Sequence, residues 1–151
     1  MKGILKRQLT ILKKDESTHK KINITIEDEA ERLEIKFRYN PRVTTDENDI
    51  NNSFKKEICE MTEEERIFLK NRYLNGQEIL KNLATLSLYH DGDYIGCGHR
   101  GCSEEKIILS KEKSSPGYKK ISDIKGKWEM IISLHGINTD IMNISLEAEW
   151  M

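Results

Sequence analysis

Several short segments of this chain alternate apolar and polar residues at every second position. Between Lys21 and Glu27, isoleucine occupies every second site, and a similar alternation recurs over 33–39, 128–134 and 144–150. Successive side chains of a β-strand point to opposite faces of the sheet. Each segment therefore predicts a strand with one buried face and one solvated face.

Further strands are predicted over 4–14 and 83–89 and around 107–109. The predicted strands do not alternate with helices in a βαβ order, which argues against a parallel sheet. The sequence therefore predicts a mainly all-β fold, an antiparallel β-sandwich or jelly roll of about seven or eight strands. The short link between 21–27 and 33–39 also predicts that these two strands form an antiparallel hairpin.

The stretch from 44 to 77 lacks strand alternation and is predicted to contain helices. Residues 46–52 are interpreted as a polar loop, and Ser53 as the cap of a short helix. Thr62 and Glu65 fit a capping box, in which each side chain satisfies a free backbone N–H at the start of a helix. This pair predicts a second helix, which begins directly after Thr62.

The second predicted helix carries three large apolar side chains, and we expect all three to pack on the sheet: Ile67, Phe68 and Leu74. The segment is too short to bury a core of its own. We therefore assign it as a helical insertion near residues 53–75, within a single β-sandwich domain that spans residues 1–151.

Composition argues against several classes of protein. The net charge of −1 provides no overall field that would attract nucleic acid or an anionic membrane. No apolar run approaches the roughly 20 residues of a transmembrane helix, and the first residues, MKGILKRQLTILKK, lack the apolar region of a secretory signal. The three cysteines, an odd number, predict free thiols and a cytoplasmic location.

The loop from Gly96 to Cys102 concentrates residue types that can carry chemistry. Cys97, His99 and Cys102 are zinc-ligand types at close spacing, and a tetrahedral zinc ion would need a fourth ligand. The candidates for that ligand are Cys59, His90 and His135. Cys97 and His99 would also face the same side of an extended strand, as a Cys–His nucleophile requires. We favour a glycine-rich connecting loop with incidental thiols, and assign no metal, cofactor or catalytic residue.

Binding of a small polar ligand is a separate hypothesis for the same region. His99 and Arg100 could hold an anion or a sugar acid, because arginine offers a planar fork of donors to a carboxylate or phosphate. Tyr94 and Tyr118 could stack on a sugar ring, and His135 completes the candidate set. The alternative for both tyrosines is burial in the sandwich.

A series of short motifs between residues 82 and 150 resembles a known β-sandwich domain. The motifs are Asn82-Leu83-x-x-Leu86-x-Leu88-Tyr89, Gly96-Cys97-Gly98-His99-Arg100, Ile107-Ile108-Leu109-Ser110, Ser115-Pro116-Gly117-Tyr118, Gly126-x-Trp128 and Ile132-x-x-His135. The domain that they resemble precedes the catalytic module in some bacterial PHP-type (polymerase and histidinol phosphatase-like) metal-dependent phosphoesterases. In that family, the following barrel carries a His-x-His metal motif on its first strand.

This chain contains no His-x-His motif. The resemblance therefore implies the sandwich fold and not the hydrolase activity. We expect a non-catalytic accessory or binding module of unknown ligand, which pairs with itself or with a PHP-type enzyme. A separate hypothesis is a purely structural dimer, with Trp150 and the C-terminal strand at the interface. The rival hypothesis is a small metal-binding protein or enzyme that uses the Cys97/His99/Cys102 loop together with His135.

Overall fold

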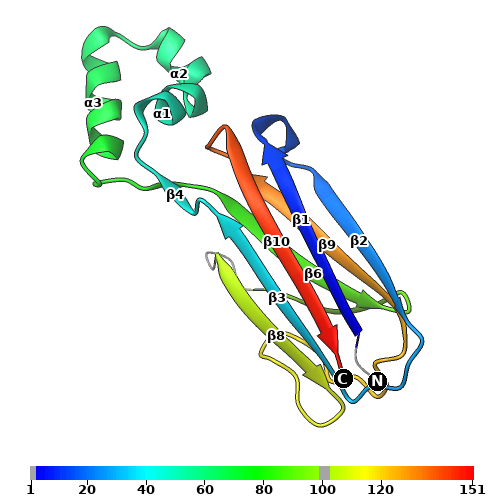
Figure 1. Cartoon of the computed structure of the whole chain (residues 1–151). Coiled ribbons are helices and arrows are strands. Elements are labelled where there is room, and N and C mark those ends of the chain that lie inside the picture. The colour runs from blue at the N-terminus through cyan, green and yellow to red at the C-terminus, as the bar shows by residue number, and fades with distance from the viewer. Residues whose placement is uncertain (1–2, 99–102) are drawn as a thin grey trace.

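The structure is a computed structural model that describes residues 3–98 and 103–151. Two four-stranded antiparallel sheets form the body of this part of the chain (Figure 1). The first sheet has the order β1 (Gly3–Leu12), β10 (Ile141–Trp150), β3 (Arg32–Asn40), β8 (Glu104–Ser110). The second sheet has the order β2 (His19–Ile26), β9 (Gly126–Gly136), β6 (Leu83–His90), β7 (Asp93–Cys97). The predicted mainly all-β sandwich is therefore confirmed, with eight strands in its described sheets.

The core lies between the two sheets and is built by the residues that the alternation assigned to the inner faces. Phe37 and Tyr39 of β3 and Trp128 of β9 are among its largest fully buried side chains. The indole N–H of Trp128 donates a 2.7 Å hydrogen bond to the carbonyl of Ile124, so its one polar atom is satisfied inside the core.

The prediction of a hairpin between 21–27 and 33–39 is wrong. β2 pairs with β9 in the second sheet, whereas β3 lies between β10 and β8 in the first. The link between β2 and β3 thus crosses from one sheet to the other. Alternation and a short link are compatible with both a hairpin and a crossing, because either arrangement buries one face of each strand.

One long side of the sandwich is closed by the segment between β8 and β9. The backbone N–H of Ser115 donates to the carbonyl of Ile108 on β8, and that of Lys119 donates to the carbonyl of Ile95 on β7. This segment therefore covers the edges of both sheets on that side. On the other side β1 and β2 form the outer edges, and basic side chains such as Lys6, Arg7 and Lys21 discourage pairing with a further strand.

Three helices interrupt the strand order between β3 and β6: α1 (Glu47–Ser53), α2 (Lys55–Glu60) and α3 (Glu63–Leu74). The predicted polar loop over 46–52 is wrong, because α1 occupies it. Asp46 caps α1 by accepting a 3.1 Å hydrogen bond from the backbone N–H of Asp49, and Ser53 is the last residue of α1. The helical insertion consequently begins at Glu47 and not near residue 53.

The predicted capping box of α3 is present in the structure. The hydroxyl of Thr62 accepts from the backbone N–H of Glu65 at 3.2 Å, and the Glu65 carboxylate accepts from the N–H of Thr62 at 3.3 Å. The helix ends before Asn75, and Gly76 follows with a φ of +76°, in the left-handed region where glycine is favoured.

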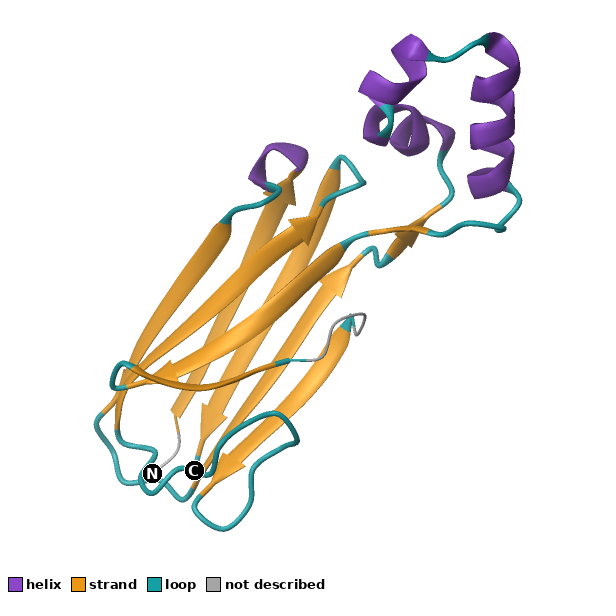
Figure 2. Ribbon diagram, turned by 180° about the vertical axis from the view of Figure 1, so that it is seen from behind, coloured by secondary structure: helices purple, strands orange, loops and turns teal. Residues whose placement is uncertain are grey.

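The helical insertion projects from one end of the sandwich and does not lie on either sheet (Figures 1 and 2). A two-stranded connection, β4 (Val43–Thr44) with β5 (Leu80–Lys81), joins it to the body. The expected packing of Ile67, Phe68 and Leu74 on the sheet is therefore wrong, and these side chains are 53%, 66% and 40% exposed. The inner faces of the sheets already cover each other, so no apolar sheet face remains for a helix.

Candidate functional site

The candidate residues from the sequence fall on different parts of the sandwich. His99, Arg100 and Cys102 lie outside the described residues. Tyr94 and Cys97 belong to β7, at the edge of the second sheet. Tyr118 lies on the closing segment between β8 and β9, and His135 near the end of β9.

Tyr118 is buried where the closing segment crosses β7. A Cβ at Gly96 would overlap the Gly117 carbonyl and the Tyr118 ring, so only glycine permits this close approach. The Tyr118 hydroxyl donates to the carboxylate of Glu105 at 3.4 Å. Burial, together with the adjacent Glu105 charge, raises the pKa of Tyr118 well above its ordinary value. The phenol is therefore a hydrogen-bond donor at neutral pH and not a general base.

Tyr94 lies on the outer face of the second sheet and is partly exposed. Its ring meets that of Tyr89 edge to face, with 5.5 Å between the ring centroids. Desolvation raises the pKa of the Tyr94 hydroxyl. The two rings form a small aromatic surface beside Cys97, of a kind that can stack against a flat ligand.

His135 lies on the same outer face of the second sheet, toward the opposite edge. Its Nε2 atom is 2.8 Å from the hydroxyl of Thr85 on β6. On the neighbouring strand pair, His19 Nδ1 is 2.9 Å from the hydroxyl of Ser133. The sequence analysis did not identify His19 as a neighbour of this region, because only the register of β2 against β9 brings it there.

Cys97 and His135 are not brought together. Cys97 is opposite Ser87 on β6, Ser87 is opposite Ile131 on β9, and His135 lies four residues further along β9. Four residues correspond to about 13 Å along a strand, and two strand spacings to about 9.5 Å. Ligands of one zinc ion lie within about 2.3 Å of the metal, so these two residues cannot share an ion.

The other two candidate ligands are also remote from each other. Cys59 is exposed on α2 in the helical insertion. His90 stacks on Trp128 with 4.3 Å between centroids and hydrogen-bonds the carbonyl of Lys125. Over residues 3–98 and 103–151, no three His, Cys, Asp or Glu side chains are grouped closely enough to hold a metal ion.

Charged side chains cover the outer face of the first sheet. The Glu34 carboxylate accepts from Lys106 at 2.9 Å and from Arg32 at 2.6 Å. Hydrogen bonds from these two cations, first Lys106 and then Arg32, lower the pKa of Glu34. A shallow polar depression of about 340 Å³ next to this group is lined by residues that include Lys36 and Arg38.

An open cavity of about 410 Å³ lies at the end of the sandwich remote from the helices. Its lining includes Arg32, Lys111, Ile121 and Ile124, and none of the described candidate residues Tyr94, Cys97, Tyr118 and His135. Its position therefore gives no support to any of the predicted ligand residues.

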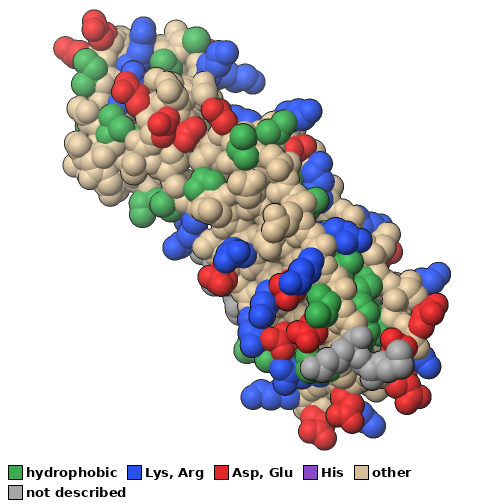
Figure 3. Space-filling view, viewed as in Figure 1, with side chains coloured by type: hydrophobic (Ala, Val, Ile, Leu, Met, Phe, Trp, Pro, Cys, Tyr) green, Lys and Arg blue, Asp and Glu red, His purple; other side chains and the backbone are tan. Residues whose placement is uncertain are grey.

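The helical insertion exposes several large apolar side chains among its charged ones. Ile67, Phe68 and Leu74 of α3 and Ile79 before β5 are all exposed. Figure 3 shows apolar atoms reaching the surface among charged ones at this end of the molecule. The sequence does place Ile67 and Leu74 on one side of a helix, because they are seven residues apart, about two helical turns. The sequence analysis expected these side chains to pack on the sheet.

Comparisons with known proteins identify no family for this chain. No family model and no curated protein matches it. A crystal structure of a protein from Sulfurospirillum deleyianum is similar over 94% of this chain and 96% of that one, with 9% sequence identity and a TM-score of 0.33. A likeness of this size supports no conclusion about fold or function. Among the described helices, none has the length and apolar character needed to cross a membrane.

Proposed function

We propose that this chain is a non-catalytic accessory module that binds another protein through its helical insertion. The observation that carries this proposal is the exposure of Ile67, Phe68 and Leu74 on one short helix held away from the sandwich. Isolated exposed apolar residues are common on protein surfaces. Here three large ones lie within about two turns of one projecting helix, and exposed apolar surface of this kind is typical of an interaction site.

The energetics of the insertion support the same function. Ile50 of α1 is fully buried, whereas α3 has no buried residue along its 12 positions. Phe54 and Tyr73 form a ring contact with 5.0 Å between centroids, which ties α3 to the start of α2. Helices of this length gain most of their stability from tertiary packing. Contact with a partner would therefore add burial that the insertion lacks by itself.

The resemblance to the sandwich domain of PHP-type phosphoesterases supports an accessory function over a catalytic one. In this proposal the sandwich is the scaffold, and the partner is either a PHP-type enzyme or a second copy of the chain. The module acts in the cytoplasm, where thiols such as Cys59 and Cys97 remain reduced.

Site-specific photo-crosslinking in cells tests this proposal. A photoreactive amino acid placed at position 68 is expected to form a covalent adduct with a protein, identified by mass spectrometry. Ile4 is the matched control, because it is also apolar and 57% exposed but lies on β1. Absence of any adduct at position 68, or equal adducts at both positions, would contradict the proposal.

A further inference from the structure

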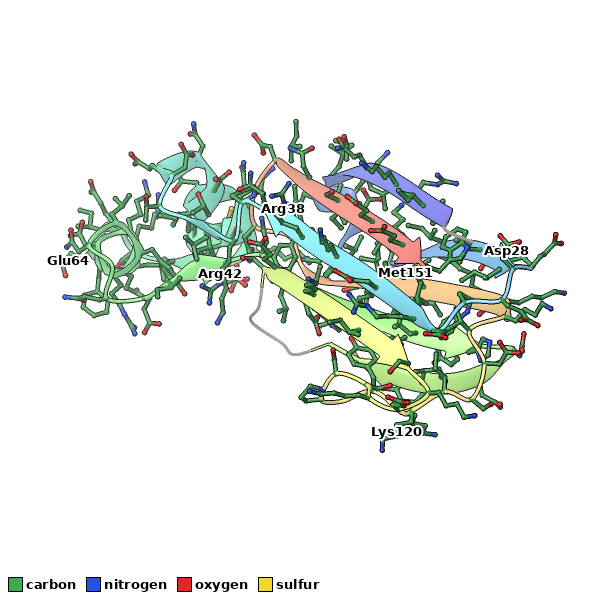
Figure 4. All side chains as sticks on the ribbon, turned by 60° about the horizontal axis from the view of Figure 1, so that its bottom comes forward. Asp28, Arg38, Arg42, Glu64, Lys120 and Met151 are labelled. Carbon is green, nitrogen blue, oxygen red and sulfur yellow. The ribbon has the colours of Figure 1, made fainter. Side chains whose placement is uncertain are left out.

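The positive charge of this chain is concentrated in its first two strands. Residues 1–26 hold seven lysine and arginine residues and two acidic residues, whereas residues 27–151 hold 18 and 24. The net charge of −1 therefore combines a basic segment with an acidic remainder. Because β1 and β2 are the outer edges of the two sheets, the basic segment occupies one long side of the sandwich. Figure 4 shows β1, in blue, at the border of the first sheet away from Lys120 of the closing segment.

The strand β1 is an open edge within the described part of the chain. One side of β1 pairs with β10 along all ten of its residues, and no described strand pairs with the other side. Every second residue of β1 therefore directs its backbone N–H and C=O groups outward. The C-terminal strand β10, by contrast, is paired on both sides, with β1 and with β3. An open edge is where an extended segment of another chain can add as a further strand.

The two faces of β1 offer different side chains to such a segment. On the core-facing side, Leu5 and Leu9 are only partly buried. Arg7 lies between these leucines, opposite the buried Leu146, and is exposed. On the outer face, the side chain of Lys6 is 69% exposed. A strand with apolar side chains opposite the leucines and acidic side chains opposite Lys6 and Arg7 would match this pattern.

The cations of β1 have fewer close acidic partners than those of β2. Both lysines of β2 have a carboxylate oxygen within 3.6 Å. The Lys6 ammonium is 4.0 Å from the carboxylate of Glu147. Arg7 makes no ion pair among residues 3–98 and 103–151, and its guanidinium donates to the carbonyl of Lys6. Lys6 and Arg7 are therefore the cations of the two edge strands that an external carboxylate can reach with the least competition.

We infer that the open edge of β1 binds an extended acidic segment of another protein, which adds to the first sheet as a strand. This surface is separate from the exposed residues of α3, so the inference does not depend on the proposed function. Backbone hydrogen bonds would supply affinity, and the charges would supply selectivity. Opposite charges directly across from each other stabilise a strand pair, and like charges destabilise it.

The same charges disfavour a second copy of β1 as the added strand. β1 contains two cations and no acidic residue, so its own copy would bring further positive charge and no carboxylate. Basic side chains on an edge strand therefore have two effects. They discourage pairing with a like strand, and they favour pairing with an acidic one.

A nucleic acid fits this edge less well than a peptide. Phosphate oxygens are hydrogen-bond acceptors, and so are the outward carbonyl groups of the edge, whereas a peptide backbone supplies both donors and acceptors. Residues 1–26 also contain no Phe, Tyr or Trp on which a base could stack.

Binding of a short peptide to the full chain tests the inference. The probe is the fluorescein-labelled peptide VTVTEEVT, whose glutamates face Arg7 and Lys6 when it runs antiparallel to β1 with its third residue opposite Leu9. Fluorescence anisotropy is expected to show saturable binding to the wild type. The variant K6E/R7E should raise the dissociation constant at least about tenfold, because two favourable cross-strand pairs become unfavourable. The matched control K119E/K120E makes the same change in net charge on the closing segment and should leave binding almost unchanged.

A second peptide separates lost binding from lost folding. The peptide VTVTKKVT should bind K6E/R7E more tightly than it binds the wild type, which requires that β1 is folded in the variant. Amide hydrogen exchange then distinguishes strand addition from simple charge attraction. Bound VTVTEEVT should slow exchange at alternate amides of β1 and leave β8 unchanged.

Several results would overturn the inference. These are no binding of VTVTEEVT to the wild type, equal weakening by K119E/K120E, no reversal of preference in K6E/R7E, or unchanged exchange in β1. Tighter binding of a short single-stranded oligonucleotide, lost in K6E/R7E, would replace the acidic segment with nucleic acid as the partner. None of these results involves α3, so each leaves the crosslinking test at position 68 to be judged separately.

Discussion

The sandwich buries a phenylalanine side chain, whereas the helical insertion exposes one. Phe37 on β3 is 1% exposed, between two sheets, whereas Phe68 on α3 is 66% exposed. Phe37 stabilises the sandwich core, whereas Phe68 is available for contact. Under the proposed function, stability and recognition would reside in separate parts of this chain, joined by β4 and β5.

The two phenylalanines provide the strongest test of this separation. Phe37→Ala removes a buried ring and is expected to lower the free energy of unfolding by about 3–5 kcal/mol. Phe68→Ala should change it by no more than about 0.5 kcal/mol in the monomer. Urea titration at a protein concentration that keeps the chain monomeric measures both values. Comparable losses from the two substitutions would break the comparison.

Two glycines test the same contrast at the level of the backbone. An alanine Cβ at Gly96 would overlap the Gly117 carbonyl, so Gly96→Ala should cost about 1–3 kcal/mol through overpacking. Gly76→Ala meets open space at a φ of +76° and should cost only the left-handed strain, about 1–2 kcal/mol. We expect the stability loss of Gly96→Ala to appear in the global unfolding of the sandwich. The stability loss of Gly76→Ala should appear only in local opening of the helices. Amide hydrogen exchange measures both.

Acid sensitivity is also expected to reside in the sandwich. The pKa of Glu34 is lowered from an ordinary value of 4.5 by Lys106 and then Arg32. Its stabilisation is therefore present above about pH 4.5 and is lost as the pH falls through the lowered native pKa. Glu34→Gln should cost about 1–2 kcal/mol at pH 7, because two charge-assisted hydrogen bonds weaken. The difference from wild type should shrink below pH 4.

The control for the acid experiment is Glu47→Gln in the insertion. Glu47 is an exposed member of the pair with Lys70, so its substitution should leave stability almost unchanged at every pH. A wild type and an E34Q variant that lose stability in parallel between pH 7 and pH 3 would refute the role given to Glu34.

The smallest expected effect concerns the start of α3. Thr62→Ala removes the hydroxyl that accepts from Glu65 and should destabilise the helix by about 1 kcal/mol. Hydrogen exchange should become faster in α3 and stay unchanged in β3 and β9. A fall in the thermal transition of the sandwich would instead show that the two parts are coupled.

Signals that depend on neighbouring residues were predictable from the sequence. The Thr62–Glu65 capping box is defined by a spacing of three residues, and the inner faces of β2 and β3 by alternation at every second position. The start of α1 was missed although Asp46 is a common N-cap residue, because the polar sequence that follows favours a loop as readily as a helix.

The partners of each element were less predictable. The hairpin between β2 and β3 was wrong because alternation marks which face of a strand is buried and not which strand lies beside it. For the same reason Ile67 and Phe68 were recognised as apolar but assigned to the wrong surface. In the candidate site, the spacing of Cys97 and His135 in the sequence gave no indication that two strand spacings separate them.

By itself the sequence determined the all-β class, the buried faces of the strands and the start of α3, since each follows from interactions within a few residues. Only the tertiary structure decided that β2 and β3 lie in opposite sheets, that Tyr118 is sealed against Gly96, and that α3 faces solvent. These features depend on contacts between residues far apart in the chain, and local patterns do not specify which distant surfaces meet.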